Sequence, residues 1–477
     1  MREKLASRIG FIFLSAGCAI GLGNIWRFPY VTGRNGGGWF VLLYLFFLAI
    51  LGLPVLMMEF ASGRAAQRSI VRLHEALTPT KKLWRLHGFA GMIGNVMLMM
   101  FYTVVTGWMV VYFIRMLSGA YTGLDAAAVA ASFDSLLGDA KTQALAMVGV
   151  SVAAAGVCAI GLQQGLERVT KWMMGALFAL IVALAANSLR LNGAGKGMAF
   201  FLIPSFANLQ AVGIVKVVVE AMNQAFFTLS LGIGAMAIFG SYLGRDRALF
   251  GEAVNVCVLD TVVALAAGII ILPACFAYGI EPGQGPGLIF VTLPNVFNHM
   301  PIGRFWGSLF FLFMGCAAMT TVLAVFEAII ACLRELTCWS RARACAVLAV
   351  VIPLLSLPCI FGFNRWAQFQ PFGAGSCVLD FEDFFVSALL LPIGAICFVT
   401  YCCHKVGWGW SNFLSEVLKK NKVLPLNKDM ADWGKLCTHY NCWTYVTNFA
   451  FYMAPVPNLW VLADNFRFFS HLHILNK

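Results

Sequence analysis

Long apolar runs separated by short polar segments dominate the pattern of this chain. A helix needs about 20 mostly apolar residues to cross the roughly 30 Å hydrocarbon core of a bilayer. Eleven runs reach that length, and they cover residues 9–31, 38–59, 88–117, 142–162, 168–190, 214–240, 251–279, 304–333, 344–362, 383–403 and 443–463. Pro455 and Pro457 interrupt the last run, which is the weakest of the set. The pattern predicts an all-α polytopic membrane protein with about 11 transmembrane helices.

The first run contains residues that break a helix. Within residues 15–29 (SAGCAIGLGNIWRFP), glycines stand at positions 17, 21 and 23, and each lowers helix propensity by roughly 1 kcal/mol relative to alanine. Hydrocarbon tolerates an unwound backbone only where it lines an enclosed polar cavity. We therefore expect this span to unwind at mid-membrane and to hold something polar. A glycine-rich packing seam is the alternative, but it explains neither Asn24 nor the Arg27-Phe28-Pro29 that follows.

The sixth run carries a similar interruption. Hydroxyl groups at 228 and 230 precede glycines at 232 and 234 within residues 223–234 (NQAFFTLSLGIG). The broken helices are thus spans 1 and 6, and each begins a group of five spans. Because five is an odd number of membrane crossings, the second group begins on the opposite side of the membrane from the first. This arithmetic predicts a 5+5 inverted repeat, with the first five helices in 1–190, the second five in 191–403, and a cytoplasmic linker with span 11 in 404–477.

Composition and charge agree with a membrane protein. Of the 477 residues, 60% are hydrophobic and 11% are charged, whereas soluble domains carry about 25% charged residues. The net charge of +12 suggests a nucleic-acid partner at first sight, but its distribution argues against one. The basic residues gather after spans 2 and 10, whereas the loop after span 3 is acidic. The positive-inside rule then places the N-terminus in the cytoplasm, and an odd number of spans places the C-terminus outside.

Several polar side chains within the apolar runs are candidates for chemistry. Asp260 lies inside span 7, where a carboxylate is costly unless it is paired, protonated or bound to a cation. Glu59 either accepts hydrogen bonds from an unwound neighbour or ends its helix in water. Tyr102 is either a ligand contact or a core tyrosine. The adjacent hydroxyls of Thr320 and Thr321 suit a small hard cation, although such residues often bond back to their own helix.

Together these residues closely resemble the neurotransmitter:sodium symporter family. The most specific pieces are residues 21–29 (GLGNIWRFP), 35–38 (NGGG), Gln224 with 227–232 (FTLSLG), 293–294 (LP) and 320–321 (TT). The resemblance implies the leucine-transporter (LeuT) fold and a place in a bacterial-type inner (plasma) membrane. It implies a secondary transporter and not an enzyme, with two sodium ions as the only cofactor and no organic cofactor.

The resemblance also implies ligand sets. The first sodium site comprises the Ala19 carbonyl, Asn24 and Thr228, with the substrate carboxylate as a further ligand and Asp260 beside it, either as a ligand or as a fixed charge in place of the chloride of animal members. The second comprises the carbonyls of Gly17, Ile20 and Ala317 and the hydroxyls of Thr320 and Thr321. The substrate contacts are Ala19, Leu22, Gly23, Leu98, Tyr102, Phe227, Thr228, Ser230, Ile233, Thr321 and Val325.

Two ion pairs act as gates by the same analogy, Arg27 with Asp383 on the outer side and Arg2 with Glu335 on the inner side. Monoamine transporters of the family carry an aspartate at the position of Gly21, so glycine favours an amino acid as the substrate. The resemblance therefore implies sodium-coupled, chloride-independent import of a neutral, hydrophobic or aromatic L-amino acid by alternating access. An ion channel needs a continuous polar pore, and a membrane-embedded enzyme needs a nucleophile with a base or a metal cluster; the sequence favours neither.

Overall fold

The computed structural model describes residues 5–279 and 287–418, and within these ranges the secondary structure is helical apart from an isolated bridge between Gly37 and Pro204. The α-helices are α1 (Arg8–Ala19), α2 (Phe28–Arg34), α3 (Gly38–Phe47), α4 (Leu53–Ala66), α5 (Ile70–Leu77), α6 (Trp84–Ser118), α7 (Ala126–Gly138), α8 (Ala140–Ile160), α9 (Arg168–Leu189), α10 (Ala194–Leu202), α11 (Phe206–Val212), α12 (Ile214–Thr228), α13 (Ala235–Tyr242), α14 (Leu249–Ala277), α15 (Leu293–His299), α16 (Gly303–Thr337), α17 (Arg341–Phe361), α18 (Val378–Asp383), α19 (Leu391–Cys403) and α20 (Trp410–Leu418). Single π-helical turns, η1 (Gly23–Arg27), η2 (Leu48–Gly52), η3 (Leu162–Glu167), η4 (Leu288–Thr292) and η5 (Phe384–Leu390), join or begin several of them.

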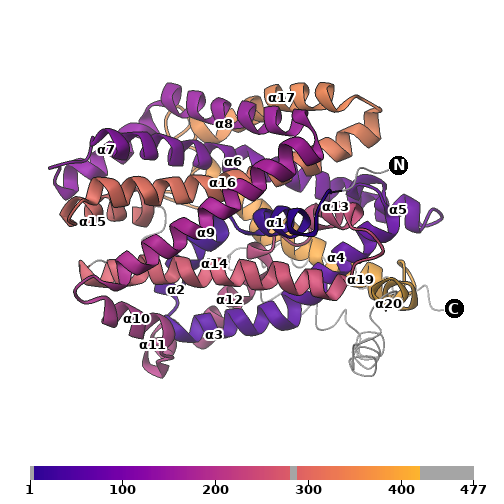
Figure 1. Cartoon of the computed structure of the whole chain (residues 1–477), viewed down its shortest axis with the longest axis horizontal. Coiled ribbons are helices and arrows are strands. Elements are labelled where there is room, and N and C mark those ends of the chain that lie inside the picture. The colour runs from indigo at the N-terminus through magenta and orange to yellow at the C-terminus, as the bar shows by residue number, and fades with distance from the viewer. Residues whose placement is uncertain (1–4, 280–286, 419–477) are drawn as a thin grey trace.

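The membrane-spanning helices match the predicted order. In the described residues, eight helices are long and apolar enough to cross a bilayer, or up to ten if two sharply bent pairs each count as one span. The continuous helices coincide with the predicted spans 2 to 5 and 7 to 10. The predicted span at 443–463 lies outside the described residues. Most helices run along the long axis of the molecule, so their ends gather at the two ends of the view (Figure 1).

The first span is broken where its glycines stand. Helix α1 ends at Ala19, Ile20 is extended, and the π-helical turn η1 and α2 continue the span after a bend of 53°. Glycine opposes helix because it loses more backbone freedom on folding than any other residue. The predicted interruption of span 1 is confirmed.

The sixth span is broken over residues 229–234. Helix α12 ends at Thr228 and α13 begins at Ala235. Between them Gly232 and Gly234 have φ of 103° and 72°, and Ser230 has φ of 50°, a left-handed conformation that is uncommon for a residue other than glycine. A separate sharp bend, of 92°, lies before α12, where α11 ends, and is not part of this break. The predicted interruption of span 6 is also confirmed.

Close backbone contacts fix the positions of the broken helices. Helix α1 packs against α9, α13, α14 and α16. A Cβ atom placed on Gly63 of α4 would lie 1.8 Å from the carbonyl oxygen of Ala237 in α13, and one placed on Gly240 would lie 2.4 Å from that of Phe60. Glycine at positions 63 and 240 therefore allows span 2 to pack directly on the second half of span 6.

Candidate functional site

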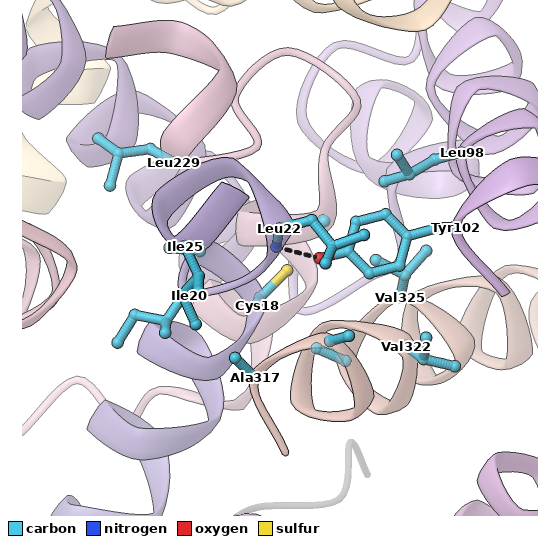
Figure 2. Packing of buried hydrophobic residues seen from close by; sticks show 14 of the residues in the cluster. Cys18, Ile20, Leu22, Ile25, Leu98, Tyr102, Leu229, Ala317, Val322 and Val325 are labelled. Carbon is cyan, nitrogen blue, oxygen red and sulfur yellow. Dashed lines mark hydrogen bonds between the residues drawn. The ribbon is translucent and has the colours of Figure 1, made fainter. Parts of the chain in front are cut away.

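The unwound part of span 1 meets the middle of α6. The backbone N–H of Leu22 donates a hydrogen bond to the hydroxyl of Tyr102 over 2.8 Å, as Figure 2 shows. A Cβ atom on Gly21 would lie 2.1 Å from the Tyr102 hydroxyl oxygen and 2.5 Å from the hydroxyl oxygen of Thr321. Any larger residue at position 21 would therefore displace the two hydroxyl groups from the positions they occupy here.

Oxygen atoms converge where α16 passes the end of α1. The Thr321 hydroxyl oxygen lies 3.1 Å from the carbonyl oxygen of Gly17, 3.5 Å from that of Cys18 and 3.2 Å from that of Ile20. Thr320, in contrast, donates its hydroxyl to the carbonyl of Ala317 in its own helix over 2.8 Å. Carbonyl and hydroxyl oxygens are the ligands that hard cations accept. The structure thus brings together most of the oxygen atoms in the predicted second sodium site.

A second polar cluster joins spans 1, 6 and 7. The side-chain amide of Asn24 donates to the Thr228 hydroxyl over 3.0 Å and to the Asp260 carboxylate over 2.8 Å, and Thr228 donates to the same carboxylate over 2.9 Å. The Asn24 oxygen accepts from the N–H of Gly21, and Tyr44 lies 3.5 Å from Asp260. The side chains of this cluster, Asn24, Tyr44, Thr228 and Asp260, are all buried. Three neutral donors therefore surround the Asp260 carboxyl group.

Apolar side chains line the remaining sides of this region. In Figure 2, Leu22 and Tyr102 meet at their hydrogen bond, Cys18 points its sulfur toward them, and Leu98 and Val325 are drawn on either side of the Tyr102 ring. The predicted contacts all lie in the breaks or in the helices beside them: Ala19, Leu22 and Gly23 in span 1, Phe227, Thr228, Ser230 and Ile233 in span 6, Leu98 and Tyr102 in α6, and Thr321 and Val325 in α16. Among these residues, Leu22 is hydrogen-bonded to Tyr102 and Gly23 lies against the ring of Phe227.

The predicted gate residues are arranged differently from one another. The Arg27 guanidinium lies 4.4 Å from the centroid of the Phe227 ring and, among the described residues, forms no ion pair with Asp383, whose carboxylate accepts from Ser387. On the other side Glu335 accepts from the backbone and the hydroxyl of Ser69 over 2.7–3.0 Å. Its predicted partner Arg2 lies outside the described residues.

Further contacts support the breaks. Glu59 accepts a hydrogen bond from the N–H of Gly232 over 2.6 Å, which confirms the buried alternative for that carboxylate. Gln224 donates to the carbonyl of Gly23, and Asn95 donates to that of Ile233, each over 2.9 Å. Sequence reasoning assigned no role to Asn95 or Tyr44, although both are polar side chains within apolar runs, which is the signal that could have found them.

Comparison with known proteins identifies the family of this chain. The family model "Sodium:neurotransmitter symporter family" matches residues 2–123 and 128–452. The uncharacterized sodium-dependent transporter YhdH of Bacillus subtilis is 33% identical over 444 residues, which are 93% of this chain and 94% of the relative. A sodium-dependent transporter of Haemophilus influenzae is 31% identical over 410 residues, 83% of this chain and 87% of the relative. The crystal structure of MhsT in complex with L-phenylalanine superposes with a TM-score of 0.84 at 36% identity, covering 95% of this chain and 100% of that one.

The fold and the two broken helices define a multi-pass secondary transporter of the LeuT fold. The chain belongs to the sodium:neurotransmitter symporter family. It is accordingly a sodium-dependent symporter and not an enzyme.

Proposed function

We propose that the chain imports a neutral, hydrophobic or aromatic L-amino acid together with sodium by alternating access. The observation that carries this proposal is the hydrogen bond from the Leu22 N–H to the Tyr102 hydroxyl, beside Gly21. Both groups can donate to a substrate carboxylate, and glycine at position 21 places no acidic side chain there to compete with it. The N-terminal end of η1 begins directly after Leu22, and the N-terminus of a helix favours negative charge. The neighbouring Leu98, Ile233 and Val325 suit an apolar side chain. MhsT, which shares the fold, was crystallised with L-phenylalanine.

We propose two sodium sites, supported by the two oxygen clusters. We assign the first to the Ala19 carbonyl, Asn24 and Thr228 with the substrate carboxylate, and the second to the carbonyls of Gly17, Ile20 and Ala317 with Thr320 and Thr321. A carboxylate shared between the substrate and the first ion couples the two fluxes, because each raises the affinity for the other. With a membrane potential of about 100 mV and a roughly tenfold sodium gradient, each sodium ion supplies about 2.3 kcal/mol from the potential and about 1.4 kcal/mol from the gradient. Two ions therefore sustain roughly 10⁵-fold accumulation of the substrate.

Asp260 makes transport independent of chloride in this proposal. Its carboxylate lies next to Asn24, Thr228 and Tyr44, where it supplies a fixed negative charge beside the first sodium site. A mobile anion is then unnecessary for charge balance. Asp260→Asn removes that charge and keeps the shape, so the variant is expected to lose transport in chloride-free medium and to regain part of it when chloride is added. Full transport by the variant without chloride would refute the role.

The remaining assignments complete the transport cycle. The end of the molecule at which α5 and α20 lie, here called the N-terminal face, is cytoplasmic, as is the N-terminus, and the C-terminus lies outside a bacterial-type inner membrane. Residues 1–190 and 191–403 are the two inverted repeats, and 404–477 comprises the linker and span 11. Arg27 pairs with Asp383 when the outer gate closes over Tyr102 and Phe227, and Arg2 pairs with Glu335 when the inner gate closes.

Uptake by purified protein in proteoliposomes tests the proposal. Labelled L-phenylalanine should accumulate when sodium is higher outside, to the same extent with gluconate in place of chloride. Unlabelled leucine, tyrosine and tryptophan should compete, whereas lysine and glutamate should not. Uptake driven equally well by potassium, or competed only by charged amino acids, would overturn it.

A further inference from the structure

The chain after span 10 forms a short strap on the N-terminal face, defined here as residues 404–418. It consists of a turn over 404–409 and the helix α20, and in Figure 1 it lies at the same end of the molecule as α5. Helix α20 buries Phe413, Glu416 and Val417 and exposes much of the remainder. A carboxylate on the buried side of an amphipathic helix is unusual, because burial of an unpaired charge is costly.

The buried carboxylate pairs with an equally buried arginine of span 2. Arg64, near the end of α4, donates to the Glu416 carboxylate over 2.8 Å and to the Glu416 backbone carbonyl over 2.5 Å. Its third nitrogen donates to the carbonyl of Arg247, in the loop that joins α13 to α14, over 2.9 Å. The two side chains are 2% and 3% exposed. One guanidinium therefore ties the strap to span 2 and to the loop that follows broken span 6.

A second attachment holds the turn of the strap. Lys81 donates to the carbonyls of Lys405 and Gly407 over 2.6 and 2.8 Å, and the indole of Trp84 donates to that of Val406 over 3.0 Å. Lys81 and Trp84 lie at the start of α6 or just before it. The strap thus bridges the beginning of span 3 and the ends of spans 2 and 6.

The position of Arg64 connects this bridge to the transport site. Its neighbour Gly63 lies against the backbone of Ala237 in α13, and Glu59, just over one turn earlier, accepts from Gly232 in the break of span 6. Arg64 therefore contacts the loop after α13, and its neighbours in α4 contact α13 itself. Removing one partner of a buried pair leaves an uncompensated charge, which costs far more than breaking an exposed pair.

We propose that the strap is a latch that keeps the N-terminal face closed, with Arg64 and Glu416 as its positioning residues. Release of this pair frees the second half of span 6, so the site opens toward that face. This inference rests on the proposed alternating-access function only in that the opening of this face is interpreted as a step of transport. It concerns residues that contact neither the sodium ligands nor the substrate contacts assigned above.

Thiol labelling of the full-length protein tests the latch without an amino-acid substrate. Cys402 is buried beside the strap, with its sulfur 4.0 Å from the carbonyl oxygen of Met58 in span 2. In proteoliposomes without sodium, Glu416→Gln should raise the rate at which maleimide labels Cys402, mapped by mass spectrometry, on the order of tenfold. Glu416→Asp, which retains the charge, should give a smaller increase.

The matched control is Glu75→Gln, which breaks the partly exposed pair between Arg72 and Glu75 on the same face. It should leave labelling of Cys402 within about twofold of the wild type. Unchanged labelling in both Glu416 variants would overturn the latch, even if sodium-driven uptake is observed. Faster labelling in Glu416→Gln would support the latch even if L-phenylalanine is not transported, so the two proposals fail separately.

Discussion

Replacing Gly21 with alanine tests the geometry of the span-1 break. The added methyl group would lie 2.1 Å from the Tyr102 hydroxyl oxygen and 2.5 Å from that of Thr321, so both hydroxyl groups must move. Displacing Tyr102 breaks its hydrogen bond with the Leu22 N–H, a loss of about 1 kcal/mol, and overpacking a buried site costs about 1–3 kcal/mol more. The sum, about 2–4 kcal/mol, corresponds to roughly 30- to 900-fold weaker binding if it falls on the bound state.

Equilibrium binding of labelled L-phenylalanine to purified protein in sodium measures this loss. Gly315→Ala is the matched control, because Gly315 lies in the same helix as Thr321 and a Cβ atom there has nothing within 4 Å. The control should bind within about twofold of the wild type, because alanine is the better helix former. Wild-type affinity in Gly21→Ala would show that Tyr102 and Thr321 do not close around position 21.

Three further predictions follow from individual contacts. Glu59→Ala leaves the Gly232 N–H without its acceptor, so the unfolding temperature should fall by an amount equivalent to about 1–3 kcal/mol, whereas Glu59→Gln keeps an acceptor and should lose less. Thr321→Val removes the oxygen that faces the carbonyls of span 1 and should raise the sodium concentration for half-maximal binding on the order of tenfold, while Thr261→Val, whose hydroxyl bonds to its own helix, should not. Burial, reinforced by nearby His87, holds the pKa of His74 well below its usual value. The unfolded chain then binds a proton at His74 more readily than the folded protein, so the folded protein keeps its full stability above about pH 6.5 and loses stability as the pH falls below that value. Between about pH 7.5 and 5.5, the unfolding temperature should therefore fall less in His74→Gln than in the wild type. An equal fall in both proteins would show that His74 does not cause the loss of stability in acid.

The broken helices could be predicted because glycine acts locally. Gly17, Gly21 and Gly23 stand within one apolar run, and Gly232 and Gly234 within another, so the interruptions are visible without tertiary information. The oxygen cluster around Thr321 could be predicted only through the family resemblance. Nothing in the local sequence distinguishes Thr321, which faces span 1, from Thr320, which bonds back to Ala317.

Contacts between residues far apart in the chain could not be predicted. Arg64 and Glu416 are separated by 352 positions, and each looks like a charge at a helix end in contact with water. His74 lies 3.2 Å from His87 because α5 folds back on α6, an arrangement that no periodicity shows. Register between distant helices depends on packing, which a single sequence does not display.

Sodium dependence of substrate binding tests the central claim most directly, namely that the breaks of spans 1 and 6 hold an amino acid and its ions together. Labelled L-phenylalanine should bind to the purified protein in sodium, and its affinity should fall steeply when potassium replaces sodium at the same ionic strength, because the ions and the substrate share their ligands. Equal affinity in the two salts would contradict the account.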